Sequence, residues 1–451
     1  MSRPKREKSP KPSKRRNKIE ADDSTEHQKV WPEKVIGGKY VRLLEKQLDA
    51  LKDEDAHGNQ CLFLDDVFVS YLLAFHNPTI RSLRTIEDFS QTVQAQKHLT
   101  VPKISKSTLS DFNKLADAAR LAPIITALRN QLDRKTRASV DRNEAGLATL
   151  LRHTVAVDGT FLDAAADVLW AVANSNNHQV TRYRARVDTK LNVSTWVPEA
   201  IVVPEPGESE ASSASKSILP GQLYLYDRGF TSYELLLAHY QLTEKEGSKK
   251  AEPTELKAHF VIRYKTEGPN SPALASATSR DLTDEDAAAG VTSDRVGYFT
   301  GENARRTRAS QILLREVVIH SEDEGTKKSI RLITNLMDVS ATTIGHLYRY
   351  RWQVELFFRW FKSIGHFDHL ISHSKDGALT HLYVTLIATL LMYLHTGYRP
   401  SKYMFALLWQ VAAGAATLEE IMPILRERER QNDLARKSAA ARLAKKKAQQ
   451  Q

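Results

Sequence analysis

Apolar residues recur every three or four positions in the first third of the chain, which predicts helices from about residue 30 to residue 137. The clearest segments are KYVRLLEKQLDAL and DDVFVSYLLAFH. Two shorter helices follow, in TIEDFSQTVQ and SKSTLSDFNKLADAA, and the Pro-containing turn between them is typical of a helix-turn-helix. Small helical domains that never touch DNA show the same pattern. We therefore expect a helical domain over residues 29–140, with DNA binding as one of two interpretations.

After residue 150 the pattern changes to short apolar runs bounded by turn residues, which predicts strands. The runs are HTVAVD, VLWAVA, TWVPEAIVV and QLYLYD. Between the last two lies GESEASSASKSILPG, which we interpret as a solvated loop. A glycine turn and an apolar helix in RGFTSYELLLAHY follow the fourth run. This order predicts an α/β fold in which helices cover a mixed sheet.

Polar stretches alternate with further strand-like runs between residues 241 and 335. These runs are HFVIRYK, VGYFTG, ILLREVVIH and SIRLITNL. We expect them to form a β-rich insertion in a domain that spans residues 150–425 and ends in helices.

Residues 347–362, LYRYRWQVELFFRWFK, place charged groups in an otherwise apolar segment. On one continuous helix Tyr348, Arg351, Glu355 and Lys362 would share a face about 60° wide, and the remaining side chains predict burial nearly all round. Buried charges cost free energy unless they face other charges. One interpretation is an internal ion pair between Arg351 and Glu355. The other is a carboxylate that binds a metal ion beside groups that bind phosphate.

The net charge of +11 lies at the two ends of the chain. Residues 1–20 contain nine Lys and Arg against two acids, and residues 426–451 contain nine against three. Basic ends are common as solubilising tails, but they also attract polyanions, and nucleic acid is then the expected partner. We expect a disordered basic tail over residues 1–28 and a basic C-terminal tail over residues 426–451.

The composition also bears on the cellular compartment. The single cysteine, Cys61, excludes an intramolecular disulfide and a zinc site built from cysteines, which suits a reducing cytosol. No apolar signal segment follows the basic N-terminus. The most apolar run, residues 382–394, is short for a membrane span and normal for a core helix. We predict a cytoplasmic, nucleoid-associated protein with no membrane partner.

Three acidic residues are the candidates for catalysis. Asp158 and Asp227 end two predicted strands, and Glu355 lies on the predicted helix. Two-metal phosphoryl transfer needs carboxylates that converge on hard cations such as Mg²⁺, and strand ends beside a helix can supply them. The alternatives are a hairpin turn at Asp158 and an ion pair or helix cap at Asp227. Spacing alone does not rank these acids above their neighbours Asp163, Asp167 and Asp188.

Other catalytic patterns are missing from the sequence. His366, His369 and His373 share a helical spacing, but turn residues follow and no acid completes a zinc site. No Ser-His-Asp order, GxGxxG motif or Walker loop occurs. The three acids are therefore the remaining candidate catalytic residues in the sequence.

The spacing Tyr348-x2-Arg351-x3-Glu355-x6-Lys362 resembles the Tyr-Arg-Glu-Lys signature of insertion-sequence transposases of family four, a group of DDE transposases. VDGTF at 157–161 resembles the region around that family's first catalytic Asp. YDRGF at 226–230 resembles the region around its second. The resemblance covers about residues 150–395.

This resemblance implies an RNase H-like fold with a β-rich insertion between the second Asp and the Glu. It implies that Asp158, Asp227 and Glu355 are the catalytic residues and bind two Mg²⁺ ions, for which Mn²⁺ would substitute. One metal would activate water to nick the transposon end, and the other would stabilise the leaving oxygen.

The resemblance also implies which residues contact DNA. Tyr348, Arg351 and Lys362 would contact the transposon end, and Arg228 beside the second Asp is a further candidate. Some relatives stack a Trp of the insertion on a flipped base. Because no Trp lies between residues 196 and 352 here, that role would fall to Tyr298, Phe299 or Tyr264, or be absent.

We therefore predict a DNA transposase that cleaves at transposon ends and joins the freed 3′-OH to target DNA, in cut-and-paste transposition. The implied partners are double-stranded DNA, as terminal inverted repeats and target, and a second copy of the chain in a homodimer on the DNA ends. Two alternatives stay open. One is a catalytically silent DNA-binding descendant or inhibitor of a transposase, and the other is a metal-dependent nuclease of the same fold.

Overall fold

The computed structural model describes most of the chain. The described residues are 44–49, 51, 62–77, 79–115, 117–136, 145–163, 172–174, 182–205, 207–243, 252–265, 272–323, 326–365, 372, 374–396 and 400–448. They fall into two compact units, one from residues 1–128 and 363–451 and one from residues 129–362. The predicted tail over 1–28, Asp167 and the three spaced histidines lie outside the described residues.

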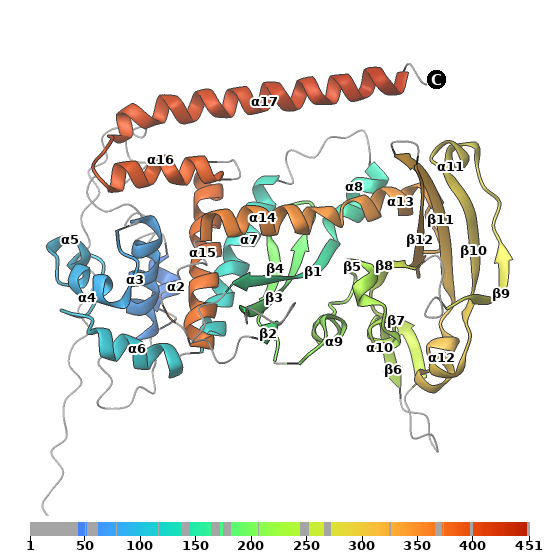
Figure 1. The fold of residues 1–451 in the computed structure, drawn as a ribbon, viewed down its shortest axis with the longest axis horizontal. Coiled ribbons are helices and arrows are strands. Elements are labelled where there is room, and N and C mark those ends of the chain that lie inside the picture. The colour runs from blue at the N-terminus through green and yellow to red at the C-terminus, as the bar shows by residue number, and fades with distance from the viewer. Residues whose placement is uncertain are drawn as a thin grey trace, which may run out of the picture. The chain divides into compact units, whose positions relative to one another are not determined.

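A ten-stranded mixed sheet forms the centre of the unit of residues 129–362 (Figure 1). The strand order is β2-β3-β1-β5-β8-β12-β11-β10-β9, and β4 also pairs with β3. β1 is parallel to β5 and β5 is parallel to β8, whereas the other pairs are antiparallel. The strands are β1 Thr154–Asp163, β2 Val172–Asn174, β3 Arg182–Asn192, β4 Pro198–Val202, β5 Leu223–Tyr226, β8 His259–Tyr264, β9 Leu274–Ser279, β10 Val291–Phe299, β11 Leu314–Asp323 and β12 Thr326–Thr334.

Helices and a small second sheet complete this unit. β6 Tyr240–Thr243 and β7 Glu252–Leu256 pair with each other. The helices are α8 Ala145–Arg152, α9 Glu210–Ser215, α10 Tyr233–Leu237, α11 Asp284–Ala288, α12 Glu302–Thr307, α13 Ala341–Arg349 and α14 Trp352–Gly365, of which α14 crosses the boundary between the units at its end, with 3-10 turns η3 Arg228–Phe230 and η4 Ala309–Gln311. The predicted mixed sheet flanked by helices is confirmed.

The two faces of the central strands carry separate cores, as expected for parallel strands buried on both sides. Val157 of β1 and Tyr226 of β5 pack on one face, together with residues of α9 and α10. Leu225 of β5 packs on the other face, where Ile344 and Leu347 of α13 cover it. The sheet is therefore enclosed between α9 and α10 on one side and α13 on the other.

The predicted single helix over 347–362 is wrong, because the chain turns at Tyr350 and Arg351 between α13 and α14. There the amide of Arg351 donates to the carbonyl of Tyr348, and the amide of Val354 donates to the carbonyl of Arg351. Each bond spans three residues, as in a 3-10 turn, and not the four of an α-helix. Burial nearly all round is also wrong, since Trp352 is 48% exposed. Tyr348 thus lies in the last turn of α13, Arg351 lies in the turn between the helices, and Glu355 lies in the first turn of α14.

Helices make up the described part of the unit of residues 1–128 and 363–451. The core helix α3, Leu64–His76, contacts α15, Lys375–Thr396. Residues 375–394 are long and apolar enough to cross a membrane, but 83% of the apolar window is buried, as in the core helix of a globular protein. The other helices are α2 Glu45–Asp49, α4 Leu83–Ser90, α5 Val93–Gln96, α6 Lys106–Leu115, η1 Ala118–Leu121, α16 Lys402–Ala412 and α17 Leu418–Ala448, while α7 Ala122–Thr136 crosses the boundary between the units.

Candidate active site

Asp158 and Asp227 lie on adjacent parallel strands. Val157 of β1 is the register partner of Tyr226 of β5, so the residue that follows each of them is an aspartate. Asp158 and Asp227 alternate with these two core residues and therefore face the side of the sheet that α13 covers. Neighbouring strands are about 4.8 Å apart, so the two carboxylates emerge side by side.

The structure corrects one detail at each aspartate. Asp158 does not end its strand, because β1 continues to Asp163 and Asp158 pairs with Thr189 of β3. The hairpin turn considered for Asp158 is therefore wrong. Asp227 directly follows β5, and its Oδ1 accepts the Arg228 amide at 2.6 Å as the cap of η3. Its cap role does not prevent a second role for the other carboxylate oxygen.

Arg351 connects Glu355 to the first aspartate. Its Nη2 donates to Oε1 of Glu355, and its Nη1 lies 3.6 Å from Oδ2 of Asp158. Arg351 also interacts electrostatically with Asp227. The predicted ion pair between Arg351 and Glu355 is thus present. Because the same guanidinium also contacts Asp158, it links Glu355 to the first aspartate.

Burial is the largest influence on Asp158. It raises the pKa of this carboxyl to about 7, although the nearby Arg351 guanidinium lowers it and the charges of Glu210 and Glu355 raise it further. Asp158 is therefore only partly ionised near neutral pH, and added positive charge would favour its ionised form.

Two donors beside these acids lack hydrogen-bond partners within the described residues. Tyr348 Oη and Arg351 Nη1 are both buried, and each side chain belongs to a residue that is 9% exposed. Burial raises the pKa of Tyr348 to about 12, so its hydroxyl keeps its proton. Tyr348 lies against Arg351, and Arg351 Nη1 has the Asp158 carboxylate at 3.6 Å, so both donors keep hydrogen-bonding capacity beside the acids.

The remaining predicted DNA contacts are more scattered. Lys362 is exposed, and its Nζ donates to the carbonyl of Phe161 on β1 at 2.6 Å. Arg228 is exposed directly after Asp227. Tyr298 is 40% exposed near the end of β10, in the part of the sheet that continues beyond β8. Their roles in DNA binding stay predictions.

Trp196 fixes the position of α14 against the sheet. It follows β3 in the turn to β4, with a φ of 63° that is rare for a bulky residue. Its Nε1 donates to Oε1 of Gln353 at 2.5 Å, and its ring packs edge-on against Phe357 and Trp360 of α14. Such a backbone conformation persists only where surrounding contacts hold it.

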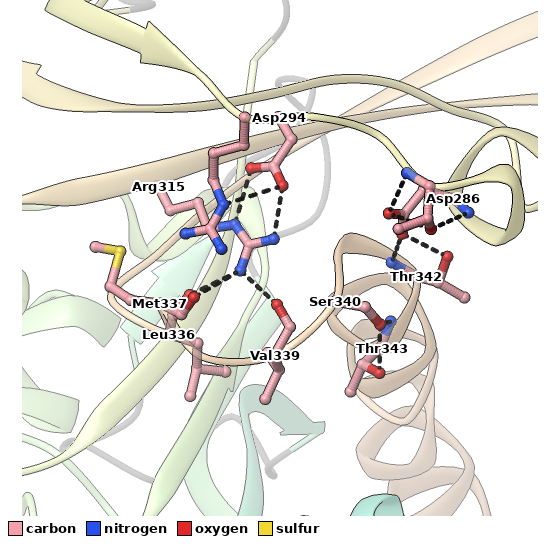
Figure 2. A network of polar contacts seen from close by, with 11 residues as sticks. Asp286, Asp294, Arg315, Leu336, Met337, Val339, Ser340, Thr342 and Thr343 are labelled. Atoms are coloured by element: carbon pink, nitrogen blue, oxygen red, sulfur yellow. Dashed lines mark hydrogen bonds and ion pairs between the residues drawn. The ribbon is translucent and has the colours of Figure 1, made fainter.

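The segment that leads into α13 is held by a buried arginine (Figure 2). Arg315 of β11 is 1% exposed and makes two hydrogen bonds to Asp294 of β10, at 2.8 and 2.6 Å. Its Nη1 donates to the carbonyls of Leu336, Met337 and Val339. The strands beyond β8 therefore determine where the helix pair α13 and α14 begins.

A second contact in Figure 2 caps α13. Oδ1 of Asp286, on α11, accepts the amide and the hydroxyl of Thr342, both at 2.8 Å. Burial works to raise the pKa of Asp286, but hydrogen bonds from Thr283 and Thr342 outweigh it and lower the pKa to about 2. An ionised carboxylate at a helix N-terminus is stabilising, so Asp286 fixes the first turn of α13.

The donor set fits hard divalent cations. The carboxylates of Asp158, Asp227 and Glu355 offer the oxygen atoms that such cations prefer, and Arg351 balances part of their charge. In the described part of the chain no three acidic, His or Cys side chains are already close enough to enclose an ion. The Arg351 guanidinium lies between Asp158 and Glu355, and its charge partly serves in place of the cation.

One acid near this site was missed in the sequence. Glu210 lies at the start of α9, in the segment that we interpreted as a solvated loop. That interpretation is wrong for residues 210–215, because Ala211 and Ala214 are buried in the core beneath β1 and β5. The apolar spacing of Ala211, Ala214 and Ile218, after the cap Ser209, was the signal that could have revealed the helix.

Comparison with known proteins agrees with this geometry. The model of the family described as the transposase DDE domain matches residues 150–391, which include Asp158, Asp227 and Glu355. This is more than half of the chain. The protein belongs to the transposase DDE domain family, and the predicted class, a DDE transposase, is confirmed.

Two relatives and one solved structure are similar to the chain. A probable transposase for insertion sequence element IS5377 of Geobacillus stearothermophilus is 37% identical over 76 residues, which cover 17% of this chain and 20% of the relative. A putative transposase for insertion sequence element IS4SA of Synechocystis sp. is 24% identical over 296 residues, 63% of this chain and 70% of the relative. A piggyBac transposase synaptic complex with hairpin DNA, solved by cryo-EM, has a TM-score of 0.38 at 11% identity, over 86% of this chain and 80% of that chain.

Proposed function

We propose that this protein cuts DNA at the ends of an insertion sequence and joins the freed 3′-OH to target DNA. What carries the proposal is the pairing of Val157 with Tyr226, because it sets Asp158 and Asp227 side by side, with Glu355 brought to them through Arg351. The family membership supports the same reaction class.

The three acids would hold divalent cations, with Mg²⁺ as the proposed ion and Mn²⁺ as a substitute. When bound, such ions polarise the phosphoryl oxygen and stabilise the attacking and leaving oxygens. The chain's own donors bind and orient the DNA. Within the described residues Tyr348 Oη is buried without a geometrically formed hydrogen bond, and Arg351 Nη1 is held only by its 3.6 Å ion pair with Asp158, so a phosphate oxygen beside the acids would accept from both.

Several finer features belong to the same proposal. The order β3-β1-β5-β8, with β1, β5 and β8 parallel, supports an RNase H-like core. The β-rich insertion over residues 241–335, which contains β7 to β12, would interrupt the 150–425 domain, and the helices of 29–140 would form a DNA-binding domain. A homodimer on terminal inverted repeats and association with the nucleoid complete the proposal.

The experiment that tests the function uses the full chain and the DNA that flanks its gene. We expect Mg²⁺-dependent nicks at the ends of the inverted repeats and covalent joining of those ends to a plasmid. Scrambled end sequences serve as the control. Cleavage without joining would favour the nuclease alternative, and binding without cleavage would favour the silent descendant.

The Tyr348→Phe substitution separates a DNA contact from a structural role. We expect the variant to be as stable as the native protein or slightly more so, since it removes a buried hydroxyl that lacks a partner. We expect its affinity for end DNA to fall by about tenfold, because one hydrogen bond to a charged phosphate is worth roughly 1.5–3 kcal/mol. Thermal unfolding and end-DNA binding of the same protein check this. Lower stability with unchanged affinity would contradict the contact.

A further inference from the structure

We propose that Thr189 is a positioning residue for the first acid of the site: its hydroxyl donates to the Asp158 carboxylate and holds it in place when Arg351 turns to a DNA phosphate. The inference rests on the proposed function and deepens it. Thr189 lies in β3, and the register of the sheet sets it directly opposite Asp158 of β1. Side chains of residues paired in this way lie on the same face of a sheet, with Cβ atoms about 4.5–5.5 Å apart.

The next residue of β3 shows which face of the sheet Thr189 occupies. Lys190 points to the α9 side, where its Nζ donates to the carbonyls of Ala214 and Ser217 at 2.9 and 2.7 Å. Successive side chains of a strand alternate between the two faces, so Thr189 points to the opposite side. That is the face on which the two aspartates of the site lie.

The Thr189 hydroxyl is buried and has no hydrogen-bond partner within the described residues. The residue is 1% exposed. A buried hydroxyl without a partner costs free energy, and valine, which has the same shape, would avoid that cost. Packing alone therefore does not explain why this position is a threonine.

Among the described sheet neighbours of Thr189, one offers an acceptor. Val187 and Leu191 lie on either side of it on the same face of β3, and Ile201 of β4 is its register partner at the other edge. All three are buried and apolar. Asp158 is the register partner on the β1 side. A hydroxyl thus interrupts an apolar row at the position opposite the acid, which indicates that it serves that acid.

The Asp158 carboxylate has capacity for this donor. Its Oδ1 accepts the amide of Gly159 at 2.9 Å, whereas Oδ2 has the Arg351 guanidinium at 3.6 Å, beyond hydrogen-bond distance. Arg351 also binds Glu355 and would bind a phosphate in the proposed DNA complex. Because the Cβ atoms of paired residues are about 5 Å apart, side-chain rotation alone brings the Thr189 hydroxyl to Oδ2 as that guanidinium turns away.

A bond of this kind acts on the chemical step and not on DNA binding. The hydroxyl contacts the carboxylate, and neither the DNA nor a cation. Side chains that bind a cation for catalysis must be held to within about 0.5 Å of the productive geometry by their own hydrogen bonds. Loss of the hydroxyl should therefore slow cleavage and weaken cation binding, while the affinity for end DNA stays the same.

The first test measures cleavage of end DNA by the full-length protein. Thr189→Val keeps the shape of the side chain and removes the hydroxyl. We expect it to lower the single-turnover rate in saturating Mg²⁺ at least about tenfold, because a hydrogen bond to a charged group is lost. End-DNA affinity should be unchanged. Thr189→Ser restores the hydroxyl and should recover most of the rate, which a role in packing alone would not explain.

A second measurement does not depend on cleavage. Ca²⁺ should raise the melting temperature of the protein bound to end DNA, and the midpoint of that rise should need at least about threefold more Ca²⁺ in Thr189→Val. Thr385→Val on α15 is the matched control, because the Thr385 hydroxyl is also buried without a partner within the described residues. It should match the native protein in both measurements. Without Ca²⁺, neither valine variant should melt below the native protein.

The outcomes separate this inference from the proposed function. Native cleavage and a native Ca²⁺ midpoint in Thr189→Val would overturn the role of Thr189 and leave the proposed function intact. Equal losses in Thr189→Val and Thr189→Ser would overturn the role of the hydroxyl. A native protein that neither cleaves end DNA nor responds to Ca²⁺ would overturn the proposed function itself.

Discussion

Alanine at Asp158, Asp227 or Glu355 should lower the rate of end cleavage and joining by at least about a thousandfold. In the proposed mechanism each carboxylate helps to bind the cations whose positive charge stabilises the transition state. DNA binding should remain nearly intact, because these acids bind cations and not phosphates. Cleavage of labelled end DNA in Mg²⁺, with binding measured in Ca²⁺, checks both parts.

Glu205→Ala serves as the control for this prediction, since it removes an exposed acid that follows the fourth strand of the sheet. The assignment of the first acid would be wrong if Asp158→Ala still cleaved in Mg²⁺. Asp163 on the same strand would then be the next candidate.

Arg315→Ala should produce the largest loss of stability in the unit of residues 129–362. It removes the bidentate partner of Asp294, which is 4% exposed and then keeps, among the described residues, only a 3.7 Å ion pair with the exposed Arg280, and it leaves three backbone carbonyls with one donor fewer. Breaking a buried pair in this way costs about 3–5 kcal/mol and should lower the melting temperature by about 10 °C. Calorimetric unfolding measures the effect.

A neighbouring pair between the same two strands provides the control. Arg295 of β10 binds Glu316 of β11, but its side chain is 42% exposed and Arg331 also holds Glu316. Arg295→Ala should therefore cost less than about 1 kcal/mol. Equal losses in the two variants would show that burial does not set the strength of these pairs.

The sequence predicted the elements whose apolar residues are continuous. QLYLYD was recognised as a strand because β5 is buried on both faces, and Asp227 followed from its end. β3 was missed, because the Arg and Lys residues of RYRARVDTKLN interrupt its pattern. Lys190 shows how the fold accommodates them, since its buried Nζ donates to carbonyls of Ala214 and Ser217.

Asp158, Asp227 and Glu355 could be named as candidates from the sequence, but their arrangement could not. Spacing placed Arg351 on the same helix face as Glu355, whereas tertiary contacts turn the chain at Arg351 and direct it to Asp158 as well. No local signal in the sequence marks that turn. Glu210 was missed because a short helix among serines resembles a polar loop until its two alanines are seen in the core.

The pairing of β1 changes at Asp158. From Thr154 to Val157 the strand has neighbours on both edges, whereas from Asp158 to Asp163 it pairs with β3 and no longer with β5. Amide exchange should therefore be slowest before Asp158 and faster after it. The aspartate is anchored to the most stable part of the sheet, while the ribbon beyond it has one open edge that can adjust as DNA enters and leaves.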